Sequence, residues 1–262
     1  MRQALPIVLL LVLAASARAS AEDGEPVPRP EPVPSQAPQS KPDFMFGAPK
    51  GSVSIRWSWD VHHAGSDWFD FVQEQLTLED NDFITRGIAG DVNVAISPRV
   101  DIVGSAEYTA RETFSEYRDF VDNNRQPINQ RTRLRQTTVT GGLRYALTDR
   151  GRSIGSLAWL PRRLVPYAGG GAGVLWYSLL QWGDFIDFED GSVFLDQFPS
   201  SGWSPVAYVH GGVDLLMFKR VALNVDVRHQ WAAPELDEQV FTGFEPLELS
   251  GVRISAGISV LF

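Results

Sequence analysis

The ionisable residues of this chain that could act together fall at every second position of short alternating segments. Asp214 and Asp226 lie in two consecutive segments, and two carboxylates held close together can divide the roles of acid and base. Arginines are interspersed with these acids, so the same residues could instead form ion pairs that perform no reaction. The full set is Arg56, Asp60, Asp91, Asp101, Glu107, Arg144, Asp214, Asp226, Arg228 and Arg253.

The segments that carry these residues alternate between apolar and polar side chains, which predicts β-strands with one apolar and one polar face. The first reads VSIRWSWDV from residue 53, and seven more begin near residues 88, 100, 137, 167, 207, 221 and 252. Each is long enough for a tilted strand that crosses a membrane. In the fifth segment, the expected apolar face holds Tyr167, Gly169, Gly171, Gly173, Leu175 and Tyr177.

The connections between these segments alternate in length. Four long ones (61–83, 111–136, 178–205 and 232–249) are expected to be external loops, whereas 97–99 and 217–220 are tight turns. The connection 148–165 is long but falls on the side of the short turns, and its arginines around Trp159 could lie against anionic lipid headgroups or in solvent. Long loops on one side and short turns on the other are typical of outer-membrane barrels with an even strand number.

The last segment reads SAGISVLF from residue 255 and ends on an aromatic residue. Its Ser255, Gly257, Val260 and Phe262 resemble the carboxy-terminal assembly signal of bacterial outer-membrane β-barrels, which the barrel assembly machinery reads. Region 44–262, with PYAGGGAG from residue 166 and VDVR from residue 225, resembles small outer-membrane barrels of the OmpA-transmembrane and OmpW type. The resemblance implies an all-β fold, an eight-stranded antiparallel up-and-down transmembrane β-barrel, and it carries over no functional residue.

Two sections precede the expected barrel. Residues 1–21 combine Arg2, an apolar run shorter than the roughly 18 residues of a spanning helix, and small residues before Ala21. This is the layout of a secretory signal peptide. Residues 22–43 are rich in proline and are predicted to be an extended periplasmic linker. We therefore expect secretion through the periplasm to the outer membrane of a Gram-negative cell envelope.

Composition excludes several classes of function. The chain has no Cys, which rules out disulfides, thiolate metal sites and Cys nucleophiles. Its formal net charge of -9 argues against a nucleic-acid partner, because phosphate binding needs a clustered basic face. His62 and His63 are adjacent and do not share a strand face, so no metal site is predicted, and no cofactor motif is found.

The interior of an eight-stranded barrel is just wide enough for side chains to fill it. We therefore expect the inward charges to form an Arg–carboxylate network that plugs the lumen, because buried charges must be paired. In this network Arg144, Arg228 and Arg253 are expected to pair with Asp91, Asp214 and Asp226. The alternative is a narrow, porin-like channel for small apolar solutes, which the likeness to OmpW-type barrels suggests.

An enzymatic alternative depends on His229, which falls on the outward face near the external end of the seventh segment. Outer-membrane lipid A deacylases place a catalytic His and, two residues later, a Ser at such a site. Here the second position is Trp231, so the nucleophile that the chemistry needs is missing. We interpret His229 and Trp231 as part of an interfacial aromatic belt, and we expect no enzymatic activity.

Three arginines are predicted to face outward at the external end of the strands: Arg86, Arg133 and Arg135. Cations at that height suit lipopolysaccharide phosphates, which Arg can bind with a bidentate fork; the alternative is that they are solvated. The sequence thus predicts a non-enzymatic, monomeric barrel with a structural, envelope or surface-interaction role. Its expected partners are outer-membrane lipid, lipopolysaccharide and the barrel assembly machinery.

Overall fold

The computed structural model describes residues 45–62, 65–79, 82, 84–121, 125–155, 158–187 and 191–262. The expected signal peptide (1–21) and Pro-rich linker (22–43) lie outside the described residues. Among the described residues, no helix is long and apolar enough to cross a membrane.

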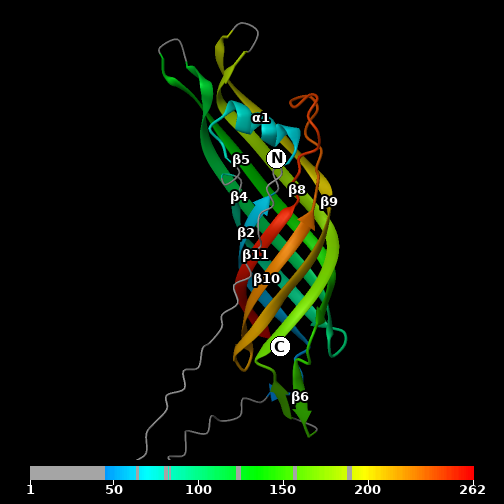
Figure 1. Cartoon of the computed structure of the whole chain (residues 1–262). Coiled ribbons are helices and arrows are strands. Elements are labelled where there is room, and N and C mark those ends of the chain that lie inside the picture. Colours follow the sequence, from blue (N-terminus) through cyan, green and yellow to red (C-terminus); the bar gives the residue numbers. More distant parts are fainter. Residues whose placement is uncertain are drawn as a thin grey trace, which may run out of the picture. The chain divides into compact units, whose positions relative to one another are not determined.

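Eight antiparallel strands close into a barrel (Figure 1). Their alternating apolar and polar residues favour strands that are exposed to different surroundings on their two faces. The last strand pairs with the first, from Gly251 opposite His62 to Leu261 opposite Ser52, which closes the ring. The predicted eight-stranded antiparallel up-and-down β-barrel is thereby confirmed. The strands are β2 (Gly51–His62), β3 (Thr85–Ala95), β4 (Val100–Val121), β5 (Pro127–Ala146), β8 (Leu164–Ile186), β9 (Val193–Phe218), β10 (Val221–Trp231) and β11 (Gly251–Leu261).

The barrel is apolar outside and polar inside, the reverse of a water-soluble protein. Trp57 is 56% exposed and Ile258 is 50% exposed, whereas Arg56 and Asp60 between such outward residues are buried. A continuous apolar belt of this kind is stable in the hydrocarbon layer of a membrane, where its exposure costs nothing. The closed ring satisfies the backbone hydrogen bonds that lipid cannot satisfy.

The expected faces of the fifth segment, now β8, were wrong. Tyr167, Leu175 and Tyr177 point inward and are at most 3% exposed, whereas Val174 is on the outer face. Glycines occupy positions of both parities in this strand, so few side chains remain to mark its lipid-facing side. The sequence pattern was therefore ambiguous where the strand is richest in glycine.

Two of the four expected external loops are in fact β-hairpins. The β4–β5 pair continues to Glu116 opposite Asn129, and the β8–β9 pair continues to Ile186 opposite Val193. Together these strands form a sheet that projects beyond the barrel (Figure 1). Polar residues on both of its faces hide the alternation that marks a membrane strand, which is why these extensions were predicted as loops.

A hydrophobic core lies at the external mouth of the barrel. Helix α1 (Asp67–Gln75) contributes Trp68, Phe69 and Val72, and the segment 232–249 contributes Leu247 and Leu249. These side chains pack with the inward residues of the projecting strands, so apolar surface that would otherwise face water is buried. The other members of this external core are Leu76, Leu78, Tyr117, Ile128, Leu134, Leu175, Tyr177, Leu179, Ile186, Val206, Ala232, Leu236 and Phe241.

The long connection 148–165 forms a small sheet at the opposite end of the barrel. Strand β7 (Ala158–Pro161) lies between β1 (Met45–Phe46) and β6 (Gly151–Ile154). Its Trp159 pairs with Met45 on one side and with Ser153 on the other, and it is buried. Trp159 is thus packed within the sheet, whereas Arg152, Arg162 and Arg163 of the same connection are exposed, so their expected surroundings, lipid headgroups or solvent, stay a prediction.

Candidate functional site: the luminal charge network

The inward charges of seven strands meet inside the barrel. The pleat directs every second side chain of a strand into the lumen, where Asp214 is partly exposed and the others are buried. The contributions are Arg56 and Asp60 from β2, Asp91 from β3, Asp101 and Glu107 from β4, Arg144 from β5, Asp214 from β9, Asp226 and Arg228 from β10, and Arg253 from β11.

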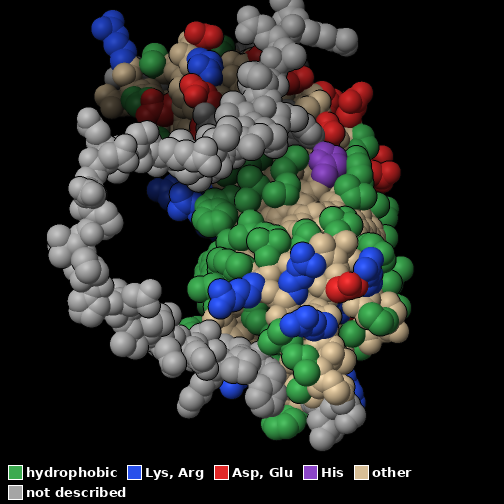
Figure 2. Space-filling view, turned by 60° about the horizontal axis from the view of Figure 1, so that its bottom comes forward, with side chains coloured by type: hydrophobic (Ala, Val, Ile, Leu, Met, Phe, Trp, Pro, Cys, Tyr) green, Lys and Arg blue, Asp and Glu red, His purple; other side chains and the backbone are tan. Residues whose placement is uncertain are grey.

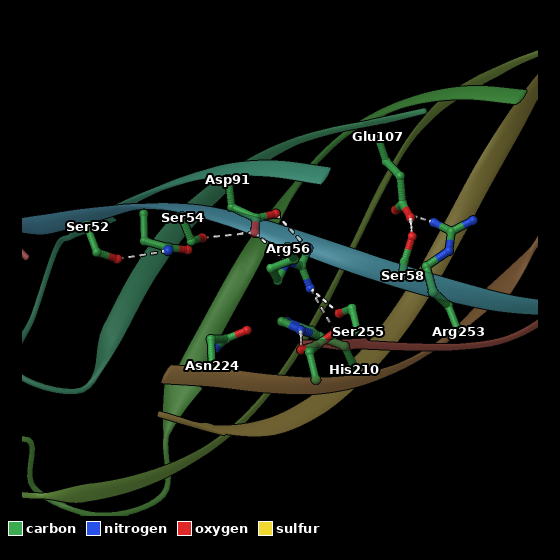
Figure 3. Close-up of polar contacts among 12 residues, drawn as sticks. Ser52, Ser54, Arg56, Ser58, Asp91, Glu107, His210, Asn224, Arg253 and Ser255 are labelled. Atoms are coloured by element: carbon green, nitrogen blue, oxygen red, sulfur yellow. Dashed lines mark hydrogen bonds and ion pairs between the residues drawn. The ribbon is translucent and has the colours of Figure 1, made fainter. Parts of the chain in front are cut away.

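Arg56 is the centre of one cluster (Figure 3). Its Nη2 donates to Asp91 Oδ1 at 2.7 Å, and its Nη1 donates to Asp226 Oδ1 at 3.2 Å and to Ser255 Oγ at 3.0 Å. Gly257 makes room for this side chain, because a Cβ there would lie 2.6 Å from Arg56 Cγ. One guanidinium thus joins β2, β3, β10 and β11.

Arg253 forms a second cluster, with Asp60 and Glu107. Ser58 Oγ donates to Glu107 Oε1 at 2.6 Å, which occupies the other oxygen of that carboxylate (Figure 3). Because β11 and β4 are three strands apart in the ring, the pair of Arg253 and Glu107 crosses the lumen. Every charge in this cluster is almost fully buried, so each depends on its partners.

A third cluster lies toward the end that carries the small sheet. Arg144 pairs with Asp214 and lies 3.7 Å from Asp101, measured from Nε to Oδ2. Arg150, the residue just before β6, reaches the same Asp101 with its Nη1 at 2.6 Å. The guanidinium of Arg144 also stacks on the ring of Tyr167, 4.0 Å from its centroid.

The observed pairing differs from the expected one in two respects. Arg144 lies beside Asp214 as expected, but Arg253 binds Asp60 and Glu107 in place of the three expected aspartates. Arg228 has no carboxylate within ion-pair distance among the described residues, and instead stacks 4.2 Å above the ring of Tyr208. Strand register decides these partners, because a side chain reaches only residues at its own height in the lumen.

Three further side chains join the network, and the sequence pattern predicted only that of His210, which falls on the inward phase. Tyr167 donates from Oη to Asp226 Oδ2 at 2.9 Å, although its strand face was misassigned. Asn224 donates to Asp214 at 2.6 Å, and its place two residues before Asp226 on the same strand face was the available signal. His210 Nδ1 lies 2.8 Å from Asp226 Oδ2, consistent with its inward phase.

The arrangement does not support acid–base chemistry by Asp214 and Asp226. Asp226 is held by Arg56, His210 and Tyr167, and Asp214 is held by Arg144 and Asn224. Two carboxylates that each have their own cation do not share a proton as a catalytic pair does. The network therefore links strands and fills the lumen.

The outward arginines differ from one another in their surroundings. Arg133 binds Glu112 with a fork, from Nε at 2.9 Å and from Nη2 at 2.6 Å, and stacks 4.8 Å from the ring centroid of Trp182. The hydrogen bond from Arg133, together with Arg131, lowers the pKa of the Glu112 carboxyl. Arg86 and Arg135 have no ion pair with a described carboxylate, and they flank Ala110 in one cross-strand row.

The residues of the expected assembly signal lie on both faces of β11. Val260 and Phe262 point outward and are about half exposed, whereas Ser255 faces the lumen. The Phe262 N–H donates to Gly51 O at 3.0 Å, and Phe262 O accepts from Lys50 N–H at 2.7 Å. These bonds join the end of β11 to the start of β2.

The histidines considered in the sequence are His229, on β10, and the adjacent pair His62 and His63, of which His62 ends β2. His229 packs edge-on against Trp231, with ring centroids 4.6 Å apart, and Trp231 supplies no hydroxyl. His63 lies outside the described residues. No group of three or more metal-ligating His, Cys, Asp or Glu side chains occurs in the part of the chain that the structure describes.

No protein-family model and no curated protein matches the chain. Among solved structures, Neisserial surface protein A (NspA) is similar at 12% identity and a TM-score of 0.42, over 84% of this chain and 97% of that one. The outer membrane protein OprG from Pseudomonas aeruginosa has 12% identity and a TM-score of 0.43, over 82% of this chain and 98% of that one. Ail from Yersinia pestis, in complex with the heparin analogue sucrose octasulfate, has 12% identity and a TM-score of 0.38, over 81% of this chain and 97% of that one. At such low identities and TM-scores these similarities carry no argument about what the chain does.

Proposed function

We propose that this protein is a non-enzymatic outer-membrane β-barrel with a closed lumen and a structural or surface-interaction role. The observation that carries the proposal is that side chains fill the barrel. The charge network crosses the lumen, and the external core caps one mouth. An eight-stranded barrel has little interior space beyond its side chains, so a conducting path would require the network to separate.

Planar-bilayer conductance tests this proposal. The unmodified protein should give no single-channel steps, whereas a porin inserted under the same conditions should. Reproducible steps from the unmodified protein would instead favour a narrow channel. A lipid A-modifying role is the less favoured alternative, because the position two residues after His229 is Trp231, and an altered lipid A mass spectrum on expression would support it.

We further propose that Arg86 and Arg135 contact lipopolysaccharide. Both are on the outer face, and Ala110 is the small residue between them in the row, which leaves space for an anion. Strands two apart in a sheet are about 10 Å apart. Arg133, the third predicted contact, is less available because Glu112 occupies its fork. This contact presupposes that the protein lies in the outer membrane as a monomer. We propose that the signal peptide and the barrel assembly machinery bring it there.

Lipopolysaccharide retention in mild detergent tests this contact. The double variant Arg86→Gln and Arg135→Gln should retain less lipopolysaccharide than the unmodified protein, and Arg133→Gln should lose less than the double variant. Arg152→Gln with Arg162→Gln, at the opposite end, is the matched control and should retain it fully. Equal retention in all variants would leave these arginines as ordinary rim residues.

A further inference from the structure

A cavity lies at the end of the barrel opposite the projecting sheet. Trp159 and Pro161 of the small sheet form part of its wall. Most of the rest comes from barrel strands that begin or end at this end of the barrel, such as β2 at Ser52 and β11 at Leu261. Its volume is about 60 Å³, and it opens to solvent. Residues of the connection 148–165 line this space, which gives the unexpected length of that connection a structural role.

The cavity is apolar on one side and charged on the other. Trp159, Leu216 and Leu261 belong to the apolar wall. Arg144 and Arg150 form the charged wall, next to their partners Asp101 and Asp214. Small-molecule sites are built in this way, from an apolar surface that supplies affinity and a few polar groups that fix orientation.

Some N–H donors of the charged wall make no hydrogen bond to the described residues. Arg150 Nε and Nη2 and Arg144 Nε are buried and have no hydrogen-bond partner among the described residues. Arg144 itself is nine-tenths buried. Three arginines (with Arg162) and two aspartates line the cavity, so the lining has one net positive charge. Buried N–H donors of this kind are stabilised by an acceptor, most strongly by an anion.

The surroundings of the cavity are also basic. Figure 2 shows Lys and Arg side chains gathered at the end of the barrel that faces the viewer. The turns there carry Lys50, Arg99, Arg152, Arg163, Lys219 and Arg220, with Asp149 among them. A concentration of positive charge around a cavity raises the local concentration of anions and their rate of entry.

We propose that this cavity binds a small amphipathic anion, an aromatic or short-chain acid. Its apolar body lies against Trp159 and Leu216, and its carboxylate accepts hydrogen bonds from Arg150 and Arg144. A neutral analogue would leave the spare donors without a charged partner, and a cation would meet the net positive lining. This inference does not depend on the proposed surface role, because the two concern opposite ends of the molecule.

Calorimetric titration of the full-length folded protein in lipid nanodiscs tests the proposal, with phenylacetate as the probe. Saturable one-site binding is expected. Phenylacetamide, which has the same shape without the charge, should bind about tenfold more weakly or worse. Arg150→Gln should weaken phenylacetate binding by a similar factor, and Trp159→Ala should weaken binding of both compounds. Arg99→Gln, an exposed arginine at the same end, is the matched control and should bind normally.

Three results would overturn the proposal. The first is no saturable binding of phenylacetate, and the second is equal binding of phenylacetamide. The third is the same loss in Arg99→Gln as in Arg150→Gln, which would show attraction to the basic surface in general. Heat-modifiable migration in gels verifies that each variant is folded, and the comparison of the two compounds on unmodified protein needs no variant.

Discussion

Replacing Arg253 with Leu is the most direct perturbation of the luminal network. Arg253 is 3% exposed, and it is the partner of two carboxylates, Asp60 and Glu107, whose side chains are 0% and 3% exposed. Removing one partner of a buried ion pair costs about 3–5 kcal/mol, because the remaining charge is left uncompensated. Two carboxylates lose their cation here, so we expect the free energy of unfolding to fall by about 5 kcal/mol, the upper end of that range.

Urea unfolding in lipid vesicles, followed by tryptophan fluorescence, measures this loss. The triple variant Arg253→Leu, Asp60→Asn and Glu107→Gln removes the two charges together with the cation, and should recover most of the loss. Arg99→Leu breaks the exposed pair with Asp149 and should change stability by at most about 1 kcal/mol. The reasoning would be refuted if Arg253→Leu cost less than about 1 kcal/mol, or if the triple variant were as unstable as the single one.

Three other changes test other parts of the molecule. Deleting Phe262 should sharply reduce the heat-modifiable, folded protein in the outer membrane, whereas Phe262→Tyr should assemble; normal assembly of the deletion would contradict the assembly-signal interpretation. Trp68→Ala in the external core should cost about 3–5 kcal/mol in the same urea assay and speed hydrogen exchange in α1; unchanged exchange would mean that the core does not hold the helix. The pKa of Glu112 is lowered by its hydrogen bond from Arg133, so the stabilisation from that pair should be present above the ordinary glutamate pKa and lost as the pH falls through the lowered one. In an NMR titration, Arg133→Gln should raise the pKa of Glu112, and an unmoved titration would show that the fork does not form.

The sequence alone predicted the barrel where the strands are regular. In β2, β10 and β11 apolar residues alternate with polar ones, and the pleat converts that alternation directly into an outer and an inner face. In β8 the glycines removed the side chains that mark the faces, and the same reasoning failed. The projecting hairpins were missed for a related reason, because outside the membrane both faces of a strand can be polar.

The partners within the network were decided only by tertiary structure. Alternation places Arg253 and Glu107 in the lumen, but they are 146 residues apart in the chain. Their contact depends on the register of each strand pair and on the closure of β11 against β2, which together set the height of every side chain in the barrel. Register is a property of paired strands and is absent from the sequence of any one of them, so the sequence predicts which charges are buried and the closed barrel decides which of them meet.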